Sequence, residues 1–173
     1  MLPWLKFGVA TVLSLAMVLV PINLPASQQK LEQVAEWKSP PTVRVCYNTP
    51  IFKYKVEEAL KFWENLGYKF GTISYNDTTE WCTGDAYFGA ITIMPNKQFL
   101  GEGVLALTRR HTYNSMITGV RIEITNRGFG RDLLLEHELG HALGWPHYNA
   151  EGHIMNPVLP RAGTDIFGLK KLS

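Results

Sequence analysis

The sequence predicts an α+β domain built around one mixed, twisted β-sheet. Apolar and polar residues alternate over 119–125, as expected of a half-buried strand, whereas apolar residues recur at helical spacing over 56–66. The chain of 173 residues is 46% hydrophobic and 18% charged, which is a globular composition and enough for one core. Strands and helices therefore belong to one domain.

The first 26 residues differ from the rest. Residues 7–20, FGVATVLSLAMVLV, carry no charge and follow Lys6, which matches the apolar core of a secretory signal. Extension to Leu24 approaches the roughly 20 residues that a spanning helix needs. We expect residues 1–26 to be either a cleaved signal peptide or an N-terminal membrane anchor. In both cases the remaining chain would lie outside the cytoplasm, secreted or attached to a membrane.

The polar segment 27–41 ends in two prolines and is expected to be a linker, which leaves residues 42–173 as the folded domain. Within the domain, Thr42–Tyr47 alternates as a strand. Thr49 and Pro50 predict a helix start, and Gly67 predicts its end. Apolar spacing over 164–172 predicts a short C-terminal helix. Further strands are expected over 70–75, 86–94, 103–108 and 119–125.

Charge and cysteine content limit the choice of partners. The net charge is +2 and the basic residues are scattered, so we expect no nucleic-acid partner. We also expect a monomer. Cys46 and Cys82 are the two cysteines of the chain. Export favours a disulfide between them, and two buried free thiols are the alternative.

The segment 131–145, RDLLLEHELGHALGW, contains the residues with the clearest chemical meaning. Its leucines predict a buried helix, on which His137 and His141 project from one face, one turn apart. Two imidazoles at this spacing can bind one Zn²⁺. Glu138 follows the first histidine, so its carboxylate lies beside the metal and can accept a proton from water.

A third ligand is expected after the helix. Gly144 can adopt a positive φ, which lets the chain reverse and bring His147 toward the other two histidines. Three protein ligands leave a fourth position open for water, which is typical of a catalytic zinc site. A structural site would fill all four positions, usually with thiolates, and neither cysteine is near in sequence.

The pattern His-Glu-x-x-His-x-x-Gly-x-x-His over 137–147 resembles the zinc signature of metzincins. Met155 lies eight residues after His147, where that family has its Met-turn, and Pro157 follows as in the matrixin branch. Tyr148 departs from the serine usual in matrixins. Only His111 and His153 remain outside the motif, so a second, structural zinc site is not expected.

The resemblance implies a metzincin catalytic domain with an active-site helix, a Met-turn and a C-terminal helix. It implies a zinc-dependent endopeptidase with one catalytic Zn²⁺, held by His137, His141 and His147. In it, a zinc-activated water attacks the peptide bond and Glu138 is the general base. A protein or peptide substrate would pair with the edge strand 103–108. The pocket beside it would be walled by Pro157, Val158 and Leu159.

The sequence leaves several alternatives open. The chain could be an inactive metzincin-fold module that binds peptides at the cell surface, a structural zinc-stabilised surface protein, or an enzyme acting on a non-peptide amide. The sequence does not decide whether calcium binds. His111 and His153 are expected to be surface or hydrogen-bonded histidines, and Tyr148 is expected at the rim of the site.

Overall fold

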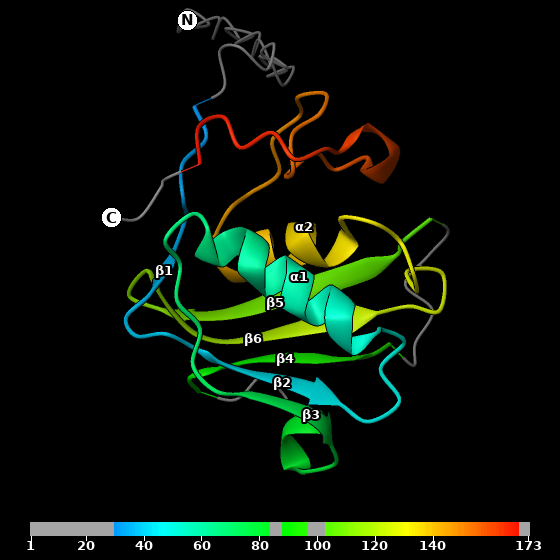
Figure 1. The fold of residues 1–173 in the computed structure, drawn as a ribbon. Coiled ribbons are helices and arrows are strands. Elements are labelled where there is room, and N and C mark those ends of the chain that lie inside the picture. Colours follow the sequence, from blue (N-terminus) through cyan, green and yellow to red (C-terminus); the bar gives the residue numbers. More distant parts are fainter. Residues whose placement is uncertain (1–29, 84–87, 97–102, 170–173) are drawn as a thin grey trace, which may run out of the picture.

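The computed structural model describes residues 30–83, 88–96 and 103–169, and these form a mixed α/β domain with a mostly parallel sheet and two α-helices (Figure 1). This architecture is compatible with the α+β class predicted from the sequence. Its elements are β1 (Glu36–Trp37), β2 (Thr42–Cys46), α1 (Lys53–Glu64), β3 (Ile73–Asp77), the 3-10 helix η2 (Glu80–Cys82), β4 (Ala90–Pro95), β5 (Ala106–Tyr113), β6 (Met116–Ile124), α2 (Leu134–Ala142) and the 3-10 helix η3 (Leu159–Arg161).

The sheet has the strand order β1-β6-β4-β2-β3, with all of these neighbours parallel, and β5 pairs antiparallel with β6. β4 and β6 are the most deeply buried strands, and almost all of their apolar side chains are buried. No other strand within the described ranges pairs with β5. One edge of β5 is therefore open, and this edge runs beside α2.

Both helices lie on the same side of the sheet and contact each other (Figure 1). The apolar stripe predicted for α1 is buried against the core. Trp63 at its end is fully buried, and its indole N–H donates to the carbonyl of Glu136 over 2.8 Å. This bond fixes α1 against the helix that carries the histidines.

The start of α1 is later than predicted. The helix begins at Lys53, after Phe52, and not at Thr49 and Pro50. The hydroxyl of Thr49 donates instead to the carbonyls of Cys46 (2.6 Å) and Ile93 (3.2 Å), so it joins β2 to β4 and does not cap a helix. Gly67, with φ +89°, ends the helical region as expected.

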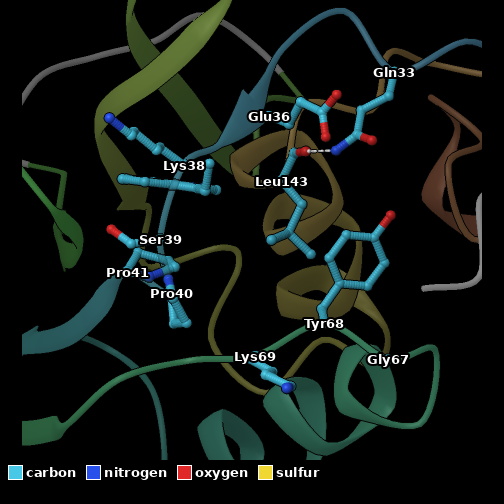
Figure 2. A pocket seen from close by; sticks show the side chains of 11 residues that line it. Gln33, Glu36, Lys38, Ser39, Pro40, Pro41, Gly67, Tyr68, Lys69 and Leu143 are labelled. Carbon is cyan, nitrogen blue, oxygen red and sulfur yellow. Dashed lines mark hydrogen bonds between the residues drawn. The ribbon is translucent and has the colours of Figure 1, made fainter. Parts of the chain in front are cut away.

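Part of the segment expected as a linker packs against the domain. Trp37 donates its indole N–H to the carbonyl of Ala142 over 2.9 Å, and β1 pairs with β6. Figure 2 shows Gln33 donating to the carbonyl of Leu143, at 2.6 Å, beside the ring of Tyr68. A cavity of about 320 Å³ lies between this segment and the turn at residues 67–69. The end of α2 is thus covered by residues 33–37.

The predicted C-terminal helix is wrong for the described residues 164–169, which form turns and one isolated bridge. The backbone N–H of Asp165 donates to Gly152 and its carbonyl accepts from Ile154, both at 2.9 Å. These groups are therefore not available for helical hydrogen bonds. Residues 170–172 of that prediction lie outside the described residues.

Two further expectations concern export. Cys46 and Cys82 form a disulfide, with their Cα atoms 5.7 Å apart. The segment 1–26, expected as a signal peptide or anchor, lies outside the described residues. Among the residues that are described, no helix has the length and apolar character to cross a membrane.

Candidate metal centre

The central helix α2 presents two histidines toward one point. It begins after Leu133, which adopts a left-handed conformation (φ 61°) without a side-chain cap. His137 and His141 lie one turn apart, and their ring centroids are 4.7 Å from each other. His137 is buried and His141 is half-buried, so the second ring lies nearer to the surface than the first.

The turn that follows α2 brings in the third histidine. Gly144 has φ +98°, and its N–H donates to the carbonyl of His141 over 3.0 Å, which closes the helix and reverses the chain. The ring of His147 then lies 5.3 Å from that of His137 and 4.5 Å from that of His141. One nitrogen from each ring lies within 4.8 Å of the other two.

The hydrogen bonds of these rings decide which nitrogens are available. Nδ1 of His137 lies 2.8 Å from the carbonyl of Ile154, and Nδ1 of His141 lies 2.8 Å from that of Trp145. A carbonyl only accepts, so each Nδ1 carries the proton and each Nε2 keeps a free lone pair. Histidine ligands of metals are usually oriented by such a bond.

Burial keeps the first two imidazoles neutral. It lowers the pKa of His137 to about 4 and that of His141 to about 3, and it also lowers the pKa of His147. At neutral pH the Nε2 lone pairs are therefore not blocked by protons. A metal ion requires this, because a protonated imidazole cannot bind it.

These residues fit a metal ion by the chemistry of their donor set. His137, His141 and His147 are the only group of three or more histidine, cysteine or acidic side chains close enough to share an ion within the part of the chain that is described. Three neutral imidazoles suit a divalent transition metal such as zinc. The cluster could therefore bind a metal and would leave part of its coordination sphere to water or a ligand.

Glu138 lies beside the cluster on α2 and is 6% exposed. The hydroxyl of Thr108, on β5, donates to its Oε2 atom over 2.5 Å. Burial raises the pKa of Glu138 to about 7, and the bond from Thr108 opposes this rise. A carboxyl group with such a pKa can both accept and release a proton near neutral pH.

Met155 is fully buried and packs against α2, the helix that carries His137 and His141. Its sulfur packs against Gly140 so closely that a Cβ atom built there would lie 2.3 Å away. The backbone N–H of Met155 donates to Nδ1 of His153 over 3.0 Å, and Nε2 of His153 lies 3.0 Å from the carbonyl of Phe167. His153 thereby joins the turn that contains Met155 to the C-terminal segment.

Two hollows meet at the cluster. One, of about 540 Å³, is lined by apolar residues of 103–106 and by Pro157, Val158 and Leu159. The other, of about 400 Å³, lies along β5 and Pro146. Glu138 and His147 line both, so the candidate metal site opens on either side along the free edge of β5.

The structure brings the sequence-derived residues of the site together, and it adds others. Tyr148 is 5% exposed, with its ring against that of His153, and so it does not lie at the rim as expected. Thr108 and Arg110 contact α2, but no sequence pattern pointed to them. His153 and His111 are each expected to be either hydrogen-bonded or at the surface. His153 is hydrogen-bonded, and His111 is exposed.

Neither models of known protein families nor curated proteins give a match to this chain. What the protein does must therefore be inferred from the chemistry of its candidate metal centre.

Proposed function

We propose that this protein is a zinc-dependent endopeptidase of the metzincin type, similar to the matrixin branch, that cleaves protein or peptide substrates. The observation that supports this most strongly is the convergence of three imidazoles beside Glu138, in hollows that follow an open strand edge. His137, His141 and His147 would hold the ion. Bound zinc would supply a Lewis acid that acidifies a water and polarises a carbonyl group.

Glu138 would act as general base and then as general acid. It accepts the proton of the attacking water and delivers it to the amine that leaves when the peptide bond breaks. Thr108 occupies one carboxylate oxygen, Oε2, so the other oxygen is left to face the water. The burial of this carboxyl keeps its pKa near the pH at which both transfers are needed.

The open edge of β5 supports an extended peptide as the substrate. Its unpaired backbone groups can pair with a substrate strand, as in other cases of strand addition. Next to the cluster, Pro157, Val158 and Leu159 form part of the wall of the 540 Å³ hollow. We propose that this hollow receives an apolar side chain of the substrate, as the resemblance to matrixins implies.

We also propose that the domain functions outside the cytoplasm, either secreted or held at a membrane by residues 1–26. The Cys46–Cys82 disulfide supports this, because structural disulfides persist mainly in oxidising compartments.

The test is cleavage of a mixed peptide library by the zinc-loaded protein, with and without a chelator, and by the Glu138→Gln variant. We expect the variant to keep zinc and to lose about a hundredfold to ten-thousandfold in kcat. Chelation should abolish cleavage while the domain remains folded. Zinc-loaded protein that binds peptides and cuts none would favour the inactive binding module instead.

A further inference from the structure

Arg110 lies on β5 two residues after Thr108, so both side chains point to the same face of the sheet. Thr108 contacts the carboxylate of Glu138, and Arg110 donates from Nη1 to the carbonyl of His141 over 2.6 Å. Its guanidinium group is thereby held at the end of α2, one helical turn beyond Glu138 along the same face.

This guanidinium has no carboxylate partner within the described ranges, unlike its neighbour. Arg109 points to the other face and forms an ion pair with Glu123. Arg110 is half-buried and forms no such pair, and burial alone lowers its pKa. An arginine carries five N–H donors and stays charged in proteins, and among the described residues only the carbonyl of His141 accepts a hydrogen bond from Arg110.

The surroundings of Arg110 form a groove that a ligand can enter. Arg110 and Thr108 line the hollow of about 400 Å³ together with Pro146 and His147. The two hollows share Ala106, Glu138 and His147, from which the apolar hollow extends along 103–105 and the other along 107–110. Arg110 therefore lies on the other side of these shared residues from the wall of Pro157–Leu159. A peptide along β5 would pass both.

We propose that Arg110 forms a carboxylate-recognising subsite, which selects peptides with an acidic group on the side of the scissile bond away from Pro157–Leu159. This rests on the proposed function in that the ligand is taken to be a peptide. The acidic group can be an Asp or Glu side chain or a terminal carboxylate. A planar guanidinium binds either one through paired hydrogen bonds, and a half-buried groove strengthens them.

Binding is measured with the zinc-loaded full chain carrying Glu138→Gln, so that no turnover is needed. The probes are fluorescein-labelled octapeptides in which one Glu is moved through the sequence, their Gln counterparts, and both sets with amidated C-termini. We expect Glu at one position to lower Kd by about tenfold to a hundredfold relative to Gln. A Glu/Gln difference that persists after amidation would assign recognition to the side chain; a loss of affinity on amidation without a Glu/Gln difference would assign it to the terminal carboxylate.

Substitution of the two neighbouring arginines isolates the effect. Adding Arg110→Gln should bring the Glu/Gln ratio of Kd values close to one. With Arg110→Glu, a peptide that carries Lys at the same position should bind more tightly than the Glu peptide. Adding Arg109→Gln, on the other face of β5, should leave the ratio unaltered. Because the ratio compares two peptides on one protein, a general change at the metal cluster cancels.

A Glu preference, or a loss of affinity on amidation, that survives Arg110→Gln would overturn the inference, as would a parent protein that shows neither effect. Cleavage of the same peptides by protein with Glu138 intact is scored separately. Absence of all cleavage would contradict the proposed endopeptidase, while the ratios of Kd would still decide the role of Arg110.

Discussion

Replacement of Gly144 by alanine tests the turn that brings the third histidine to the cluster. Gly144 has φ +98°, a conformation that side chains rarely adopt. A Cβ atom at this position would also lie 1.9 Å from the carbonyl oxygen of Ala35. The N–H of Val34 donates to the carbonyl of Gly144 over 2.9 Å, so the N-terminal segment cannot move away without losing this bond.

The magnitude follows from two contributions. A left-handed conformation costs an alanine about 1–2 kcal/mol. Moving a packed backbone away from the new methyl group adds about 1–3 kcal/mol, by analogy with overpacked cores. Gly144→Ala should therefore lower the free energy of unfolding by about 2–5 kcal/mol. Gly130 is the matched control, because its φ is +70° and nothing lies within 4 Å of a Cβ atom there.

The assay is urea unfolding of both variants with excess chelator, followed by zinc titration. Gly130→Ala should show only the conformational cost, whereas Gly144→Ala should be less stable and bind zinc more weakly, because His147 follows the turn. Amide exchange at Val34 should be faster in Gly144→Ala alone. Equal stability of the two variants would refute the close approach between Gly144 and Ala35.

Three other predictions concern the cluster and its support. Thr108→Val removes the 2.5 Å bond to the proposed base and should lower kcat by about tenfold with little effect on KM, whereas Thr108→Ser should restore it; equal rates for both variants would contradict a positioning role. Gly140→Ala would place a Cβ atom 2.3 Å from the sulfur of Met155 and should lower the free energy of unfolding by about 1–3 kcal/mol in urea melts, so an unchanged midpoint would refute this packing. Burial lowers the pKa of His137 to about 4 and of His141 to about 3, against about 6.5 in an unfolded chain. Between pH 6.5 and 4 the unfolded state therefore binds more protons than the folded state. The urea midpoint of metal-free protein should therefore fall as the pH is lowered from 6.5 to 4. It should fall less in a variant that carries both His137→Phe and His141→Phe.

Much of the site could be predicted because it lies within one short stretch of chain. His137, Glu138 and His141 are fixed relative to one another by helix geometry alone. Gly144 adds a turn whose direction follows from its positive φ, which places His147 near the other two. Local rules were sufficient for these residues.

The remainder depends on contacts between distant residues, which local patterns do not contain. Thr108 meets Glu138 because β5 is the edge strand beside α2, and 30 residues separate the two. The C-terminal helix predicted from apolar spacing does not form over the described residues, since Asp165 pairs with residues 152–154. The polar composition of 27–41 predicts a linker, whereas Trp37 and Gln33 donate hydrogen bonds to carbonyl groups at the end of α2.

Zinc X-ray absorption spectroscopy of the purified chain tests most directly whether three imidazoles hold one zinc ion beside Glu138. We predict one zinc per chain, coordinated by three imidazole nitrogens and one oxygen, and loss of one nitrogen in His147→Ala. A zinc ion coordinated by sulfur, or a nitrogen count that His147→Ala leaves unchanged, would contradict the assignment.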